Sequence, residues 1–153
     1  MKTPPPPANA REVFEIWREE DREIETLLNQ IRDWMIFAGE LGVPRYSETI
    51  NRLAWLRSCL SKHFDREDEL CDQLTDFYTS PCPEIDAMRR QASHDRTLLL
   101  ERVDALILDL DALEPPFESW QAAIDEVGLF LDTVEQHEDQ ESESIRALLP
   151  LAS

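Results

Sequence analysis

The chain contains only three histidines, and two of them begin the same short pattern. His63 and Glu67 lie four positions apart, and so do His137 and Glu141. On a helix this spacing places both side chains on one face, where an imidazole and a carboxylate can bind the same metal ion. Acidic residues are frequent, with 33 Asp and Glu in 153 residues, so the spacing alone is weak evidence. It gains weight only if these residues face an apolar core.

The elements that must position these residues are predicted to be four long helices. Helix-forming residues are abundant, and the few breakers gather between long uninterrupted segments. After a Pro-rich segment at residues 1–7, which we expect to be disordered, the breakers separate helices at about residues 8–41, 47–78, 83–113 and 117–149. Gly42 suits a C-terminal cap, Ser47 an N-terminal cap, and Pro83 a first helical turn. Short connections between helices of similar length predict an all-α, up-down-up-down antiparallel four-helix bundle over residues 8–153.

Each predicted helix has an inward stripe of residues at alternating three- and four-residue spacing, and ionisable groups interrupt these stripes at one level. The interrupting residues are Asp21 in the first helix, His63 and Glu67 in the second, His94 in the third, and His137 and Glu141 in the fourth. The third helix is less regular, because a second apolar stripe accompanies the one that contains His94. Buried ionisable groups must be paired or bound to a metal, so the sequence favours a metal site. Satisfied core histidines and solvated helix faces are the alternatives.

In this arrangement the chain resembles the hemerythrin-like, or HHE cation-binding, family. That family has a histidine on helix one, His-x-x-x-Glu on helix two, a histidine on helix three and His-x-x-x-Glu on helix four. The matching segments here are HFDRE at 63–67, His94 in SHDRTLLLERVDAL, and HEDQE at 137–141. Five of the six family ligand positions agree. The sixth, the histidine of helix one, is replaced by Asp21, which would ligate the metal, accept a hydrogen bond from a ligand histidine, or face solvent.

The resemblance implies a hemerythrin-like bundle with two non-haem iron ions. By position, Glu67 and Glu141 would bridge the ions, and His63, His94 and His137 would be terminal ligands. Manganese or zinc would suit the same groups. Because the ligand set is richer in carboxylates than that of oxygen-carrying hemerythrins, it favours Fe(III) and makes simple oxygen carriage an unfavoured role.

The function that the resemblance implies is to sense or process a small redox species, namely oxygen, nitric oxide or peroxide. Two alternatives remain open at this stage. One is an enzyme-like role in peroxide breakdown or in iron donation for iron–sulfur repair. The other is a metal-stabilised interaction module without redox chemistry, and whether the protein is an enzyme is left undecided. A sensor without a signalling domain would act through a separate protein partner, and a homodimer is a further option.

The composition and the net charge limit which other partners and which compartment we expect for the protein. A net charge of −18 repels phosphate backbones and anionic lipids, so we expect neither a nucleic acid nor a membrane as partner. No apolar run approaches the roughly 20 residues of a membrane span. Cys59 and Cys71 are 12 positions apart on one predicted helix, about 18 Å, so they cannot form a disulfide with each other. With an odd number of cysteines, these features predict a cytoplasmic protein.

Overall fold

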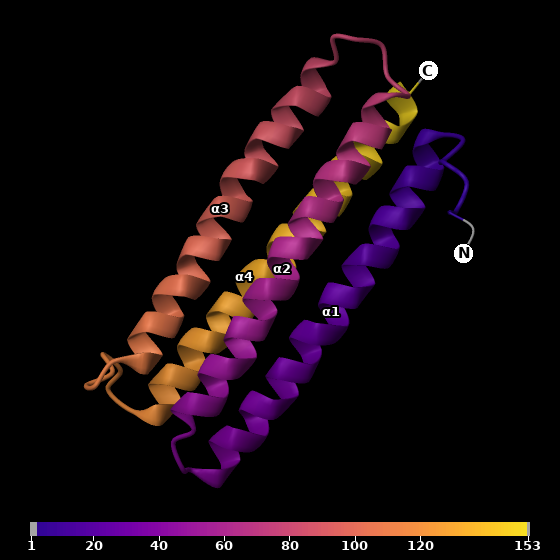
Figure 1. Cartoon of the computed structure of the whole chain (residues 1–153). Helices are drawn as coiled ribbons and strands as arrows, with labels where there is room; N and C mark the ends of the chain where they lie inside the picture. Colours follow the sequence, from indigo (N-terminus) through magenta and orange to yellow (C-terminus); the bar gives the residue numbers. More distant parts are fainter. Residues whose placement is uncertain (1–2, 153) are drawn as a thin grey trace.

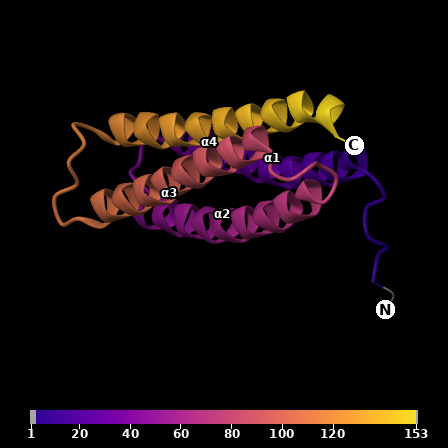
Figure 2. The ribbon, with the colours of Figure 1, turned by 90° about the horizontal axis from the view of Figure 1, so that it is seen from above.

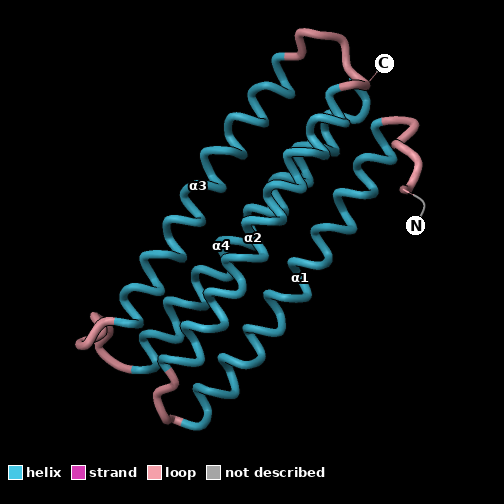
Figure 3. Tube along the Cα trace, viewed as in Figure 1, coloured by secondary structure: helices cyan, strands magenta, loops and turns pink. Residues whose placement is uncertain are grey.

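The computed structural model describes residues 3–152, and this part of the chain forms four long helices packed as a bundle (Figure 1). The helices are α1 (Ala10–Leu41), α2 (Tyr46–Thr75), α3 (Pro83–Asp111) and α4 (Trp120–Leu148), and a short 3₁₀ helix, η1, follows at Leu149–Leu151. No strand occurs among the described residues (Figure 3). The predicted all-helical bundle is confirmed. Of the segment 1–7 that was predicted to be disordered, residues 1–2 lie outside the described residues and residues 3–7 carry no helix or strand.

The predicted helix ends differ from the observed ends by at most three residues. Pro83 is the first residue of α3, as predicted. The prediction that Ser47 caps the second helix is wrong, because α2 already begins at Tyr46. The Thr49 N–H donates to the Arg45 carbonyl oxygen at 3.1 Å, so the first helical turn closes on residue 45 and Arg45 takes the capping position without a side-chain bond.

Gly42 ends α1 in the left-handed conformation, with φ 67° and ψ 8°, and its N–H donates to the Gly39 carbonyl oxygen. A Cβ disfavours this conformation, so we expect Gly42→Ala to lower the free energy of unfolding by about 1 kcal/mol, measured by urea denaturation. Gly128→Ala is the matched control. Gly128 lies inside α4 with no heavy atom within 4 Å of an added Cβ, so alanine there should stabilise by up to about 1 kcal/mol. Equal stability of the parent and Gly42→Ala would contradict this account.

Each helix packs against two neighbours, in the pairs α1–α2, α2–α3, α3–α4 and α4–α1 (Figure 2). The N-terminal end of α1 and the C-terminal end of α4 lie at the same end of the bundle (Figure 1). None of the described helices has both the length and the apolar character needed to cross a bilayer. The pairing matters for function because side chains of all four helices can meet along the bundle axis.

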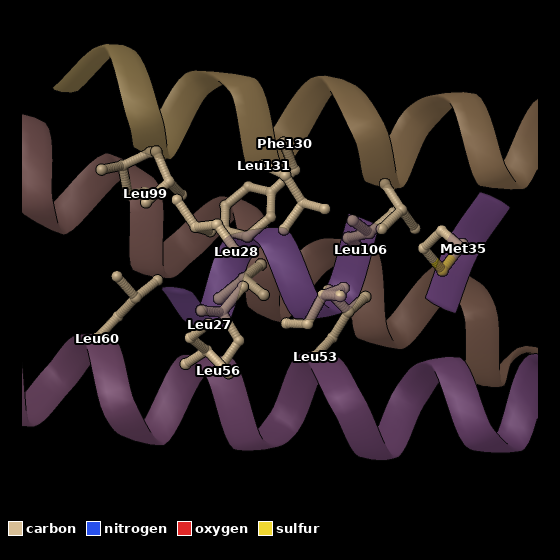
Figure 4. Close-up of a cluster of buried hydrophobic side chains, with 14 of the residues drawn as sticks. Leu27, Leu28, Met35, Leu53, Leu56, Leu60, Leu99, Leu106, Phe130 and Leu131 are labelled. Carbon is tan, nitrogen blue, oxygen red and sulfur yellow. The ribbon is translucent and has the colours of Figure 1, made fainter. Parts of the chain in front are cut away.

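The interior contains two separate clusters of buried apolar side chains. The larger cluster lies toward the C-terminal end of α1 and includes Leu28, Leu56, Leu106 and Phe130, one from each helix (Figure 4). The smaller cluster lies toward the N-terminal end of α1 and includes Val13, Trp17, Leu70, Ile85 and Ile145. Between the two clusters, every helix turns at least one ionisable side chain inward. This polar layer is the level that the sequence stripes predicted.

The inward faces of α1, α2 and α4 agree with the predicted stripes over most of their length, but the face of α3 does not. The stripe that contains His94 is exposed at all seven of its positions, from Ala87 to Leu108. The buried face of α3 is the second stripe, and it includes Ile85, Ala92, Arg96, Leu99, Val103, Leu106 and Leu110. Both stripes carry leucines, so hydrophobic periodicity did not decide which one faces the core.

Cys59, Cys71 and Cys82 are all free. Cys71 is a buried residue of α2, and burial raises the pKa of its thiol to about 12. A thiol that stays protonated is a poor nucleophile, so Cys71 acts as a small apolar side chain in the smaller cluster.

Candidate metal centre

The polar layer contains seven ionisable side chains that are buried or nearly buried. They are Asp21 from α1, His63 and Glu67 from α2, Arg96 from α3, and His137, Glu138 and Glu141 from α4. Helix α4 contributes three of them, because its buried face at this level includes the adjacent residues His137 and Glu138 as well as Glu141. The layer separates into two halves that differ in how their charges are balanced.

The first half consists of Asp21, His63, Glu67 and Glu138. Each offers one potential ligand atom, and these four atoms all lie within 4.8 Å of one another. The His63 Nε2 atom is 2.8 Å from Glu138 Oε2, 3.2 Å from Glu67 Oε1 and 3.9 Å from Asp21 Oδ1. The Ser142 hydroxyl donates a hydrogen bond to Asp21 Oδ2, which orients that carboxyl. Three helices thus bring three carboxyl groups and one imidazole around a common point.

Several oxygens of this half lack hydrogen-bond partners among the described residues. Asp21 Oδ1, both Oε atoms of Glu67 and Glu138 Oε1 are buried and have no hydrogen bond of acceptable geometry. A buried carboxylate oxygen without a partner is costly, and native structures contain few of them. Here they gather within one small volume. A bound cation could take one oxygen from each of the three carboxyl groups, so the donor set fits a metal ion.

Electrostatics in the first half favour a positive charge at its centre. Burial and then hydrogen bonding and repulsion from Glu138 raise the pKa of Asp21 to about 8. Burial and repulsion from Glu138 also raise the pKa of Glu67 well above its usual range. Burial opposes the charged form of His63, but its hydrogen bond to Glu138 and the nearby carboxylate of Glu67 outweigh burial and raise its pKa to about 11. The raised pKa values of these three groups mean that they tend to hold protons at neutral pH, which reduces the repulsion between the carboxyl groups.

In the second half of the layer, the positive charge of Arg96 balances the negative charge of the carboxylates. The Arg96 guanidinium donates from Nε to Glu141 Oε1 at 3.2 Å and from Nη2 to Glu141 Oε2 at 3.1 Å. Its Nη1 atom donates to Asp68 at 2.8 Å, and Nη2 also lies 3.5 Å from Glu67 Oε1. The His137 Nε2 atom is 2.6 Å from Glu141 Oε1. Burial would raise the pKa of Glu141, but His137 and Arg96 together lower it to about 2, so Glu141 stays a carboxylate.

The structure brings together only part of the predicted ligand set. Asp21, His63 and Glu67 lie in the first half, whereas His137 and Glu141 lie in the second half with Arg96. The prediction that His94 faces the layer is wrong, because His94 is exposed. Residues 94 and 96 point about 200° apart around a helix, so the rotation that buries Arg96 turns His94 toward solvent. Metal binding by the others stays a prediction.

Two residues of the layer, Glu138 and Arg96, were not predicted from the sequence, although the apolar residues around each of them indicate a buried position. Glu138 lies seven positions after Leu131 and seven before Ile145, two fully buried residues, so it continues a heptad stripe adjacent to that of His137. Arg96 follows Ala92 by four positions and precedes Leu99 by three on the second stripe of α3. In both cases an ionisable residue stands between apolar residues on a helix face next to the predicted one.

Two cavities lead from the surface to the first half. One, of about 270 Å³, lies between α1 and α4 and is lined by Asp21 and Glu138. The other, of about 510 Å³, lies between α1 and α2, and His63 and Ile24 line it. Ile24 lines both cavities. A metal ion or a small molecule therefore has short routes to the four residues.

Comparisons of the chain with protein-family models, curated protein sequences and solved structures gave no match.

Proposed function

We propose that the protein binds one transition-metal ion, preferentially iron, between Asp21, His63, Glu67 and Glu138. The observation that carries this proposal is that the three carboxyl groups gathered with His63 hold four buried oxygens without hydrogen-bond partners among the described residues. Three carboxylates and one imidazole suit iron or manganese, and zinc accepts the same donors. The three negative charges match Fe(III), which argues against reversible oxygen carriage.

The resemblance noted in the sequence implied two irons, and we propose one. A second ion would need Glu141 and His137 as ligands, but Glu141 already accepts two hydrogen bonds from the Arg96 guanidinium. His94, the remaining ligand of the two-iron hypothesis, is exposed. The bundle itself we propose to be up-down-up-down and hemerythrin-like. This is supported by the short connections and by the pairing of each helix with the next one along the chain.

The role that we propose for the ion is to sense or process oxygen, nitric oxide or peroxide. The cavity between α1 and α2 supports it, because it reaches His63 and has room for such a small molecule. Peroxide breakdown and iron donation for iron–sulfur repair are enzyme-like alternatives that use the same centre.

A layer that functions without metal, as the centre of an interaction module, is the second candidate. The observation that favours it is the Arg96–Glu141 pair, in which the chain supplies its own cation. Protons on Asp21 and Glu67 would then neutralise the first half. This candidate and the first one make opposite predictions about metal content.

Metal analysis separates the two candidates. Protein stripped with a chelator and reloaded with Fe(II), Mn(II) or Zn(II) should retain about one ion per chain. Glu138→Gln keeps the shape of the side chain and removes a ligand charge, so it should weaken binding by about tenfold or more. The matched control is Asp139→Asn, which removes the same charge from the adjacent, exposed residue and should leave the stoichiometry unchanged.

Each outcome is informative about one candidate. A parent protein that retains no metal, or a Glu138→Gln variant that retains as much as the parent, would contradict the metal proposal. Changes in the absorption of the iron-loaded protein on adding nitric oxide or peroxide would favour the sensing role. Rapid catalytic loss of peroxide would favour the enzyme-like role instead.

A further inference from the structure

A second surface feature lies away from the polar layer, between the C-terminal half of α1 and the N-terminal half of α4. It is a groove of about 780 Å³ with a largely apolar lining. Met35 and Leu131 are buried at its base, whereas Ile36 and Leu129 on its walls are 62% and 54% exposed. Large apolar side chains that are grouped and exposed indicate a surface for binding a partner.

Two glycines, Gly39 and Gly128, line the groove. Gly39 on α1 faces Ile124 on α4, and a Cβ on Gly39 would lie 3.2 Å from Ile124 Cδ1, so the missing side chain lets the two helices approach closely. Gly128 differs, because no heavy atom lies within 4 Å of where its Cβ would be. The fold therefore has room for a side chain there, and glycine is the weaker helix former. Its effect is to leave open space in the lining of the groove at this position.

The charges around the groove are negative and mostly without cationic partners. Glu40, Asp125 and Asp132 line it and are exposed, and among the described residues neither Glu40 nor Asp125 forms an ion pair. Arg32 is the only basic residue in the lining, and it is already bound to Asp132 and Glu135 at 2.9 Å each. With a net charge of −18 on the chain, this surface attracts cationic partners and repels a second copy of itself.

We propose that this groove binds an amphipathic helix of a partner protein, with apolar residues on one face and Lys or Arg beside them. The α4 side of the groove runs from Gln121 to Asp132, about 16 Å or three helical turns, which sets the length of helix that fits. The apolar face of that helix fills the space beside Gly128, and its basic residues meet the acidic rim. The proposal does not depend on metal binding.

A synthetic peptide tests it. The probe is a fluorescently labelled amphipathic helix of about four turns, with leucines on one face and lysines elsewhere, and binding is followed by anisotropy at physiological ionic strength. The parent should bind it. Ile36→Gln removes an apolar contact and Gly128→Leu fills the groove, so each should weaken the dissociation constant by about tenfold or more. Both positions tolerate the change in the free protein, because Ile36 is exposed and Gly128 has open space beside it.

The control variant is Leu108→Gln, the same kind of change at a side chain on α3 that is 71% exposed. It should bind the peptide as the parent does, and a peptide with glutamates in place of lysines should not bind to the parent. No binding to the parent, or equal binding by Ile36→Gln and Leu108→Gln, would overturn the proposal. A parent that is dimeric in solution, and monomeric after Ile36→Gln, would make a second copy the occupant and would overturn it as well.

Discussion

Replacing Arg96 with methionine should lower the free energy of unfolding of the metal-free protein by about 3–5 kcal/mol at neutral pH. Methionine keeps much of the volume of the side chain but removes the cation that Glu141 and Glu67 face. Glu141 is buried and held as a carboxylate, so removal of the guanidinium leaves a buried charge with only His137 as partner. Urea denaturation followed by circular dichroism, in the presence of a chelator, measures the loss.

The control for this variant is Arg146→Met. Arg146 pairs with Glu143 on the surface, where both side chains are more than half exposed, so its removal should change stability by no more than about 0.5 kcal/mol. Arg96→Met combined with Glu141→Gln should lose less than Arg96→Met alone, because the second change removes the stranded charge. An Arg96→Met protein as stable as the parent would show that Arg96 does not balance the layer.

Without metal, the protein should lose stability as the pH rises from about 5 to about 8, and Asp21→Asn should remove about 2–4 kcal/mol of that loss. The pKa of Asp21 in the folded state is about 8, above its usual value of 3.8. Its contribution to stability is therefore complete below pH 3.8 and is lost as the pH rises toward 8. Glu67, with its raised pKa, contributes with the same sign. Asparagine stays neutral at every pH and so lacks this dependence.

The measurement is a series of urea denaturation curves across this pH range, with Glu143→Gln as a control at an exposed carboxylate. The control should follow the parent. At low pH the protein should instead lose stability as the pH falls. The pKa of Glu141 is about 2 in the folded state, below its usual value of 4.5, so its contribution is complete above pH 4.5 and is lost as the pH falls toward 2. Identical profiles for the parent and Asp21→Asn would rule out proton uptake by Asp21 on folding.

Much of the fold could be predicted from the sequence because the helix breakers are concentrated at the connections. Gly42 and Pro83 mark real helix ends, and between such ends the chain has no strong alternative to helix. On α1 and α2 one stripe is clearly more apolar than the others, so the inward positions of Asp21, His63 and Glu67 followed from spacing alone.

The residues of the polar layer were predicted less well, because the rotation of α3 about its own axis did not follow from the sequence. Helix α3 has leucines on two faces, with Leu98 and Leu108 exposed and Leu99 and Leu106 buried, so the pattern did not fix its rotation about its own axis. The sequence analysis predicted that His94 faces the layer, whereas Arg96 does so in the structure. The observed layer therefore contains a permanent positive charge that was not expected. On α4 the buried face is wider than one stripe at this level, so His137 and Glu138 are buried side by side.

The division of the interior by the polar layer also bears on how the bundle opens. The two apolar clusters share no buried apolar residue, so the interior connection between the ends of the molecule passes through ionisable groups. The end built on Val13, Leu70 and Ile145 has the smaller cluster and therefore forms the less stable cooperative unit. We therefore expect neutralisation of the layer, by protons, by Arg96 or by a bound cation, to couple the two ends of the bundle. Without it, the end that holds the N-terminus of α1 and the C-terminus of α4 should open first.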